Sequence, residues 1–344
     1  MLYRVLEGDK HIHVFAMTMI LEENKVWIDG CFDFSHHGHA GAILQARRTV
    51  APGAEPTSEL YCGVHSDEEI LHNKGPPVMH SAERYAHTAA SRWCSHMIPD
   101  APYVTEPRVL DSYGCKYVVH GDDITLDANG EDCYQEMKDL GRFKVVKRTA
   151  GVSTTDIIHR MLTGKYEYAM GMPPVSQMQM YATGPDGYAP WCSVYEGSLC
   201  PNKLLVKGDA QVESLPAVLI SGDFDLFHMG HIEQLQRAKE VLYPGCRIVV
   251  GLHLDDTKTG TRTIMSLSER LLSILSCKYV DGVVVQPEMS GEHTSGWTDS
   301  LPIDDARLLE GGSFSYLTKQ TIVSRVEDSR VLYVARNTKK GMVY

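Results

Sequence analysis

The sequence predicts an α/β fold that contains two tandem copies of one domain, each built around a parallel sheet. The first observation is a repeated loop: residues 30–39 (GCFDFSHHGH) and 222–231 (GDFDLFHMGH) share Gly, Phe, Asp, His, Gly and His at the same spacing. The second is that both loops follow a β-favouring run and precede a helix-favouring segment. The third is that the agreement continues downstream in two further pairs of segments, 62–69 with 250–257 and 81–98 with 267–284. Matching over this length indicates a duplicated domain, and the alternation of strand and helix patterns indicates parallel sheets with helices on both faces.

Length and composition bound the class of protein. The 344 residues suffice for about two domains, and 43 % hydrophobic and 22 % charged residues are ordinary for a globular protein. The net charge of −11 does not favour nucleic acid or an anionic membrane as a partner, so an anionic substrate must be held by a few local cations. Nine scattered cysteines and the lack of a secretory signal predict reduced thiols and a cytoplasmic location. Residues 1–23 form an N-terminal extension whose apolar patch is too short to span a bilayer, so we expect no transmembrane segment.

Residues 26–39 predict a strand, a glycine-containing loop and a helix, an order that suits anion binding. The apolar run ends at Gly30, and a helix-forming segment follows the loop. His36 and His39 are three residues apart, so they lie on one face of the first helical turn, while Gly38 lets a phosphate approach closely. A helix start directs N–H groups at an anion, so nucleotide phosphates fit this loop. A metal site and a surface accident are the alternatives for a single His-x-x-His pair.

Two further segments place polar side chains next to predicted turns or strand ends. Lys74 precedes a Gly-Pro-Pro turn and suits a phosphate clamp, although a lone lysine is more often simply solvated. A β-favouring run at 117–119 leads into His120, and Asp122 and Asp123 follow at the carboxyl end of that strand. These two carboxylates suit a base amino group or Mg²⁺, and turn or helix-cap chemistry is the alternative interpretation.

Residues 144–161 predict a second strand, loop and helix that faces an anion. The strand runs into Arg148 and Thr149, Gly151 follows, and Ser153 is placed to cap an amphipathic helix. Capping explains the serine, but it does not explain the Arg-Thr-x-Gly sequence on the entering strand. We therefore expect this helix start to hold phosphates together with the arginine.

The two motifs together carry a resemblance to a known family. His-x-Gly-His at 36–39 and Arg-Thr-x-Gly-x-Ser-Thr-Thr at 148–155 resemble the signature pair of the cytidylyltransferase branch of the HIGH-type nucleotidyltransferases. The duplication narrows this resemblance to the tandem members of that family, which use CTP and phosphoethanolamine. The resemblance implies two Rossmann-like (HUP-type) nucleotidyltransferase domains and transfer of CMP from CTP to phosphoethanolamine. It also implies a place in phosphatidylethanolamine synthesis and Mg²⁺ that is bound with CTP.

The resemblance covers 24–165 closely and the second half more loosely, and it divides the chain into four parts. We expect the extension 1–23, a catalytic cytidylyltransferase domain at 24–165, a linker at 166–215, and a degenerate cytidylyltransferase-like domain at 216–344. The linker is rich in Gly, Pro, Tyr and Met and has no clear helical or strand period. Its aromatic residues and methionines predict that it packs against one or both domains.

Specific site residues follow from the resemblance, position by position. The expected catalytic residues are His36, His39, Lys74 and Arg148. The expected CTP-binding residues are Cys31, Phe32, His36, His39, His120, Asp122, Arg148, Thr149, Gly151, Val152, Ser153 and Thr154. The expected substrate-binding residues are Lys74 and Tyr103. No metal ligand from the protein is expected.

The second copy departs from the family pattern. It keeps a vestigial loop whose expected residues are Asp223, Phe224, His228 and His231. Residues 313–325 fall where the second signature would lie, but no Arg-Thr-x-Gly precedes them, and the counterpart of the 120–123 segment is missing. We predict that this half does not catalyse, because it lacks the arginine that holds phosphates.

Competing interpretations belong to two classes. One is a cytidylyltransferase that acts on phosphocholine or glycerol phosphate, and the other is a non-catalytic nucleotide-binding module. The duplication argues against the first, and the complete motifs of the first half argue against the second. A class I aminoacyl-tRNA synthetase also has a HIGH loop, but this sequence lacks a KMSKS-like segment. Substrate preference and oligomeric state, with a homodimer as one option, are left open.

Overall fold

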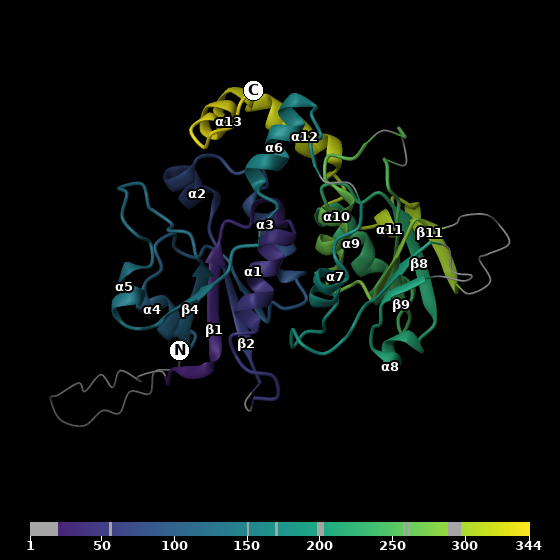
Figure 1. The fold of residues 1–344 in the computed structure, drawn as a ribbon, viewed down its shortest axis with the longest axis horizontal. Helices are drawn as coiled ribbons and strands as arrows, with labels where there is room; N and C mark the ends of the chain where they lie inside the picture. The colour runs from purple at the N-terminus through teal and green to yellow at the C-terminus, as the bar shows by residue number, and fades with distance from the viewer. Residues whose placement is uncertain are drawn as a thin grey trace.

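The protein consists of two α/β halves that lie side by side (Figure 1). The computed structural model describes residues 20–54, 57–149, 151–168, 171–197, 203–256, 259–260, 262–287 and 297–344. Most of the predicted extension 1–23, and Ala150 of the second motif, lie outside these residues. Within the described part, none of the helices has both the length and the apolarity needed to cross a bilayer.

The first half is a five-stranded parallel sheet in the order β3-β2-β1-β4-β5. Its elements in chain order are β1 (Glu22–Gly30), the 3₁₀ turn η1 (Asp33–Ser35), α1 (His37–Arg47), β2 (Glu59–Val64), α2 (Asp67–Lys74), α3 (Ser81–Ala89), β3 (His96–Ile98), α4 (Pro107–Ser112), β4 (Cys115–Gly121), α5 (Gln135–Asp139), β5 (Phe143–Val146) and α6 (Thr154–Thr163). The predicted strands at 26–28, 117–119 and 144–147 and the helices after both motifs are therefore confirmed.

The central strand β1 is buried on both faces because the helices cover both sides of its sheet. Val26 and Ile28 point into a core that extends into the second half, while Trp27 packs with residues of α4 and α5 on the opposite face. This period-two division follows from the alternation of side chains along a strand. Asp29 is the next residue of the strand and is also buried, although it is charged.

The second half contains a six-stranded sheet in the order β11-β8-β9-β10-β6-β7. Its elements, with those of the preceding segment, are α7 (Val175–Tyr181), β6 (Ser193–Glu196), β7 (Lys203–Val206), α8 (Ala210–Glu213), β8 (Ala217–Gly222), α9 (Met229–Arg237), the π-helical turn η2 (Ala238–Leu242), β9 (Arg247–Leu252), α10 (Leu267–Leu275), β10 (Gly282–Val285), β11 (Asp299–Pro302), α11 (Ala306–Leu309), α12 (Lys319–Asp328) and α13 (Arg330–Thr338). The parallel tandem fold expected from the sequence is confirmed.

The segment 166–215 has regular structure, contrary to the reading of its sequence. Its strand β6 pairs in parallel with β10, and β7 pairs with β6 in antiparallel orientation, so the segment extends the sheet of the second half. It also touches the first half, because the Tyr181 hydroxyl donates a hydrogen bond of 2.6 Å to the His37 carbonyl. The prediction that this segment packs on the domains is confirmed.

The two halves face one another across a pseudo-two-fold axis. Helix α1 contacts α10, and α3 contacts α9, although α9 is the counterpart of α1 and α10 is the counterpart of α3. At the axis, Ser91 and Cys277, which are equivalent positions of the repeat, form an antiparallel bridge. Two reciprocal hydrogen bonds flank it, from Arg92 N to Ser276 O and from Lys278 N to Ala90 O. The duplication therefore produces an interface like that of a symmetric dimer, within one chain.

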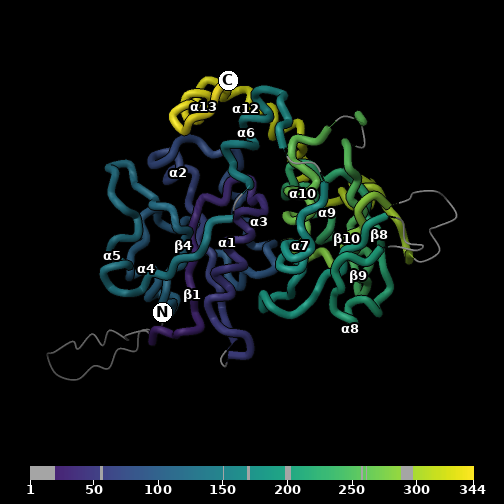
Figure 2. Tube along the Cα trace, in the orientation of Figure 1, coloured from purple at the N-terminus to yellow at the C-terminus, as the bar shows by residue number. Residues whose placement is uncertain are grey.

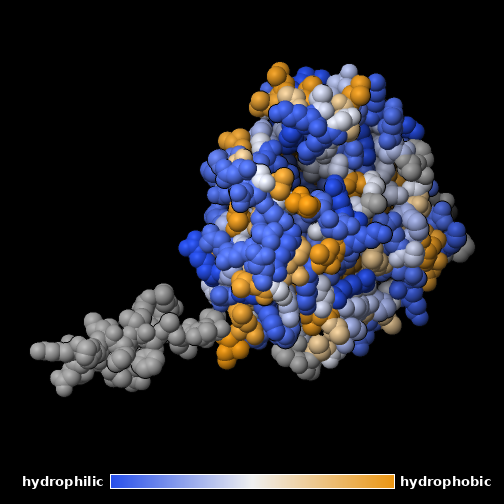
Figure 3. All heavy atoms as spheres, turned by 60° about the vertical axis from the view of Figure 1, so that its left-hand side comes forward, coloured by the Kyte–Doolittle hydropathy of each residue, from blue (hydrophilic) through white to orange (hydrophobic). Residues whose placement is uncertain are grey.

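The last two helices return to the first half. In Figures 1 and 2, α12 and α13 lie with α6 across the top of both halves, and α13 lies above α2. The polypeptide thus crosses from the second sheet back to the edge at which the first sheet's strands end. The face turned forward in Figure 3 is mainly hydrophilic, with apolar residues scattered over it.

Candidate active site

A cavity of about 250 Å³ lies in the first half, where β1, β4 and β5 end. Ligands of parallel α/β sheets bind at this edge. Of the residues expected in the site, those that line the cavity are Cys31, Phe32, His36, His39, Lys74, His120, Arg148, Thr149, Val152, Ser153 and Thr154. Segments that are far apart in the sequence, such as those of Cys31 and Thr154, therefore meet in one place.

Three expected residues are not part of the cavity lining. Tyr103 is buried in the core beside β1, with its ring 5.0 Å from that of His65. Gly151 lines a neighbouring groove between the halves. Asp122 lies at the edge, where its carboxylate accepts a hydrogen bond from the backbone N–H of Arg148. Its neighbour Asp123 does line the cavity.

The histidine pair is held in a defined orientation at the start of α1. His36 is the N-cap of this helix, and its Nδ1 accepts a hydrogen bond of 3.1 Å from the N–H of Gly38. Because Nδ1 is the acceptor, the proton of the neutral ring is on Nε2, which lies 3.5 Å from the Thr154 hydroxyl. The His39 ring stacks on that of His36, with centroids 4.0 Å apart and 18° between planes. The pair thus presents a fixed N–H donor to the cavity.

The surroundings of both histidines favour the neutral rings at neutral pH. Burial, followed by the nearby His39, His37 and Arg148, holds the pKa of His36 well below its usual range. Burial and the neighbouring Lys74 lower the pKa of His39 to about 3. A bound phosphate would oppose these effects, since an anion favours the protonated form of a ring beside it. Nδ1 of His39 is buried without a hydrogen-bond partner among the described residues.

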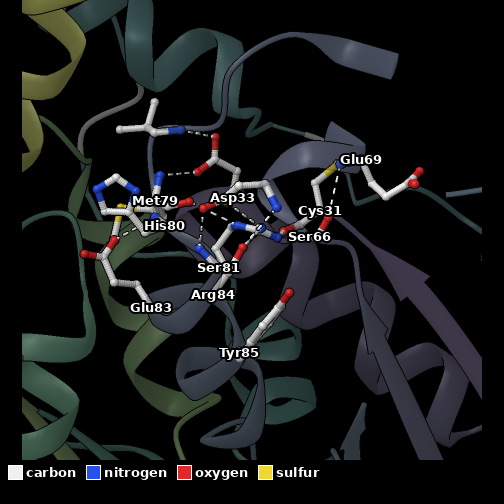
Figure 4. Close-up of polar contacts among 12 residues, drawn as sticks. Cys31, Asp33, Ser66, Glu69, Met79, His80, Ser81, Glu83, Arg84 and Tyr85 are labelled. Carbon is white, nitrogen blue, oxygen red and sulfur yellow. Dashed lines mark hydrogen bonds and ion pairs between the residues drawn. The ribbon is translucent and has the colours of Figure 1, made fainter. Parts of the chain in front are cut away.

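The loop that precedes the histidines is held by buried polar contacts (Figure 4). The Asp33 carboxylate accepts hydrogen bonds from the N–H groups of Val78 and Met79, and this fixes the Gly-Pro-Pro segment that follows Lys74. The buried Arg84 donates to the carbonyls of Cys31 and Met79. Asp33 and Arg84 therefore connect the loop at residues 31–33 with the segment at residues 78–79.

Three residues of this loop, Phe32, Phe34 and Ser35, have left-handed backbone conformations, and the repeat reproduces the first two. Phe32 and Phe34 have φ of 48° and 64°, and their counterparts Phe224 and Leu226 have φ of 50° and 55°. Left-handed conformations are unfavourable for such bulky residues and persist where the surrounding structure imposes them. The two copies thus share the backbone geometry of this loop, although the residues around it differ.

The start of α6 provides the second anion-binding surface. Ser153 caps the helix by accepting a hydrogen bond from the N–H of Asp156, and the Thr154 hydroxyl donates to the carbonyl of Asp33. Arg148 enters beside this helix start and lies 3.6 Å from Asp123. With 59 % of its side chain exposed, the arginine is free to turn toward a phosphate in the cavity. An anion bound here would meet both the positive end of the helix dipole and the guanidinium.

Sequence reasoning did not assign several lining residues to the site, and three charged ones among them are Asp29, Arg336 and Lys340. Asp29 forms the floor, where its carboxylate accepts hydrogen bonds from Trp27 Nε1, the Thr105 hydroxyl and the Tyr134 hydroxyl. The sequence contains an indication of the role of Asp29, because a charged residue inside a buried strand is uncommon. Arg336 and Lys340 come from α13 and the residues that follow it. Their distance from both motifs in the sequence hides them from local pattern analysis.

The second half has a corresponding cavity of about 230 Å³, but its charges are arranged differently. Asp223, His228 and His231 line it, whereas Phe224 is buried beside it. Lys319 occupies the position equivalent to Thr154 and forms ion pairs with the buried Asp225 and Asp256. The cation of this site is thus neutralised by the protein itself. The prediction that this half does not catalyse is consistent with this arrangement and remains to be tested.

The fold and the first cavity together define an α/β protein of the nucleotidyltransferase class, with two helix starts, a neutral histidine pair and cations around a space for a polyphosphate. The cytidylyltransferase-like family model matches residues 27–160 and again 219–325. An ethanolamine-phosphate cytidylyltransferase of Saccharomyces cerevisiae is 51 % identical over 330 residues, which cover 95 % of this chain and 99 % of the yeast protein. Ethanolamine-phosphate cytidylyltransferases of Dictyostelium discoideum and Mus musculus are 37 % and 36 % identical, over 92 % of this chain and 94 % and 89 % of theirs. The chain belongs to the cytidylyltransferase-like family and, within it, to the ethanolamine-phosphate cytidylyltransferases.

Proposed function

We propose that this enzyme transfers CMP from CTP to phosphoethanolamine and releases CDP-ethanolamine and pyrophosphate. The observation that carries the proposal is the meeting of both motifs in one cavity of a chain that matches ethanolamine-phosphate cytidylyltransferases over nearly its whole length. A choline-phosphate cytidylyltransferase of Arabidopsis thaliana matches over only 42 % of this chain, so phosphocholine is the less favoured acceptor.

The chemistry requires positioning more than proton transfer. A phosphate monoester is largely dianionic at neutral pH, since its second pKa is about 6, so it attacks without a general base. Its oxygen forms a bond to the α-phosphorus of CTP while the bond from that phosphorus to the bridging oxygen breaks, and pyrophosphate leaves with the electron pair. His36 and His39 donate to oxygens at the reacting phosphorus. Lys74 lies between the two anions, and Arg148 with the start of α6 holds the leaving pyrophosphate.

Mg²⁺ is proposed to enter on CTP, not in a site built by the protein. Among the described residues there is no cluster of three or more side chains that could hold a metal ion. One carboxylate at the rim, Asp123, fits an ion held mainly by phosphates and water, as is usual for Mg²⁺. When bound, the ion would neutralise charge on the β- and γ-phosphates.

Asp29 is proposed to attract the ammonium group of the acceptor. The carboxylates that line the cavity are Asp29, Asp33 and Asp123. Asp33 has the Arg84 guanidinium nearby and Asp123 faces Arg148, whereas the donors to Asp29 are three neutral side chains. The charge of Asp29 is therefore the one that a small cation could balance. Glycerol phosphate carries no such cation, so this feature favours an aminoalkyl phosphate.

The test is a panel of acceptors with radiolabelled CTP. Phosphoethanolamine should yield labelled CDP-ethanolamine and pyrophosphate, and phosphocholine and glycerol phosphate should be turned over much more slowly. Arg148→Gln should lower kcat/KM by roughly 100-fold, because a charge-assisted contact to phosphate is lost. Equal turnover of phosphoethanolamine and phosphocholine would overturn the substrate assignment, and lack of any labelled product would overturn the activity.

A further inference from the structure

The segment from α13 onward is anchored on the first half by specific contacts. Arg330, at the start of α13, donates a hydrogen bond of 2.8 Å to the carbonyl of Leu162 at the end of α6. The Tyr344 ring lies edge-on to that of His159 of α6, with centroids 4.8 Å apart, and its hydroxyl accepts from the buried Asn337. These contacts hold the segment over the cavity of the first half, although it follows the second sheet in the sequence.

Two cations of this segment line the cavity. The Arg336 guanidinium lies over the Tyr333 ring at 4.8 Å and reaches the carbonyl of Pro76 at 3.4 Å, next to the turn that follows Lys74. Nζ of Lys340 lies 3.5 Å from the hydroxyl of Thr155, in the first turn of α6. One cation therefore lies near each of the two anion-binding surfaces.

Positive charges outnumber negative charges at this site. Five cations line the cavity, Lys74, Lys147, Arg148, Arg336 and Lys340, against the three carboxylates Asp29, Asp33 and Asp123. Of these cations only Arg148 forms an ion pair with a carboxylate in the described part of the chain. Burial and the neighbouring Lys74, Arg336 and Arg148 lower the pKa of Lys340 to about 8, although part of its side chain stays open to solvent. Like charges gathered in this way repel one another until an anion joins them.

We propose that Arg336 and Lys340 bind phosphate oxygens of the substrates, so that the last segment of the second half completes the active site of the first. The proposal rests on the proposed function, because it assigns two more binding residues to the same reaction. It also gives the second half a role that needs no catalysis of its own, namely to hold α12 and α13 in place.

The two cations are expected to serve different phosphates. Lys340 lies at the start of α6, on the side assigned to the β- and γ-phosphates of CTP, while Arg336 lies beside the turn after Lys74, on the side of the acceptor phosphate. The experiment separates these sources by measuring the KM for each substrate while the other is saturating. Binding of pyrophosphate alone provides a readout that is independent of turnover.

The variants are Arg336→Gln and Lys340→Gln in the full chain, with Lys339→Gln as the matched control. Lys339 is exposed, lies one residue from Lys340 and is not part of the cavity lining. Lys340→Gln should raise the KM for CTP and the Kd for pyrophosphate about 10-fold, and Arg336→Gln should raise the KM for phosphoethanolamine by a similar factor, since each loses a charged hydrogen bond. Arg336→Lys should recover part of the loss, and the control should behave like the wild type.

The outcomes are distinct. If both variants keep the melting temperature of the wild type and the KM and kcat for both substrates are unchanged, the segment does not contact the ligands and the inference is wrong. If Arg336→Gln does not fold, Lys340→Gln still decides the matter, because its side chain reaches solvent. A wild-type enzyme that forms no CDP-ethanolamine refutes the proposed function, whereas an active wild type with unaffected variants refutes this inference alone.

Discussion

Burial determines the state of the histidines in this protein. His37, His39 and His87 lie in the interior, and burial lowers their pKa to about 4, about 3 and about 3. At neutral pH they therefore act as uncharged hydrogen-bonding groups, and in the active site this keeps the N–H donors ready without repelling Lys74 or Arg148. The same property makes the fold sensitive to acid, because these rings protonate freely only when the chain unfolds.

His87 tests this pH dependence. Its ring lies edge-on to that of Phe227 across the boundary between the halves. Below pH ~6.5 the unfolded chain binds a proton at this histidine that the folded chain does not bind, so stability falls as the pH falls. Between pH 7 and pH 5.5 each such histidine lowers the free energy of unfolding by about 1 kcal/mol.

We expect His87→Leu to reduce the loss of stability between these two pH values by about that amount, as measured by urea denaturation. The comparison isolates one group from the buried carboxylates Asp33 and Asp225, whose raised pKa values act in the opposite direction. An unchanged pH dependence in the variant would show that the ring is not the source.

Sequence reasoning found the site residues that belong to local patterns. The histidines, Lys74 and Arg148 follow or precede turns and strand ends, so their chemistry is visible within a few residues. Arg336 and Lys340 were missed because their place depends on how α13 folds back onto α6. Tyr103 shows the converse, since its sequence neighbourhood does not reveal that its side chain points into the core.

Helices and strands were predictable where residue propensity, hydrophobic periodicity and terminating residues such as glycine or a helix cap indicate the same element. β1, α1 and α6 have an apolar run, a glycine break or a capping residue, and each lies where these features indicate. β6 and β7 were not predicted, because their residues carry no clear alternation. β6 is ordered by pairing with β10, and β7 is ordered by pairing with β6. Short strands of this kind owe their form to the partner strand more than to their own sequence.

The cap of α6 provides the prediction at the scale of an element. Ser153→Ala removes the oxygen that accepts the Asp156 N–H, which should cost about 1 kcal/mol of stability and loosen the helix start that faces the phosphates. Ser66→Ala is the matched control, because Ser66 caps α2 by the same bond to Glu69 but lies outside the cavity lining. Thermal unfolding should register both losses, and only the first variant should show a raised KM for CTP. A raised KM in both, or in neither, contradicts the assigned role of this cap.

At the scale of the whole molecule, two equivalent ion pairs join the halves. Arg160 of α6 forms a two-point contact with Glu269 of α10, and Arg325 of α12 forms the same contact with Glu83 of α3. Both glutamates also cap their own helices, so each pair ties a helix start in one half to a helix of the other. The duplication was visible in the sequence, but this pairing was not, because it depends on the mutual orientation of the copies.

The Arg160–Glu269 pair should be costly to break from one side. Both side chains are less than a tenth exposed, so Glu269→Gln leaves a buried guanidinium without its counter-charge and should destabilise the protein by about 3 kcal/mol. Arg160→Met combined with Glu269→Gln leaves no unpaired charge and should be more stable than the single variant. Chemical denaturation of both proteins and of Arg160→Met supplies the double-mutant cycle. Additive effects of the two changes would show that the pair does not act as a unit.

The bridge between Ser91 and Cys277 has a genetic consequence. In a dimer of identical chains every codon change appears on both sides of the axis, so a residue that suits only one side cannot be selected. Here the two sides are encoded separately, and each copy accumulates its own alleles while it keeps the shared contact surface. The second copy can therefore carry Lys319 where the first has Thr154, and can lack the Arg-Thr-x-Gly sequence, while the first copy is unaffected.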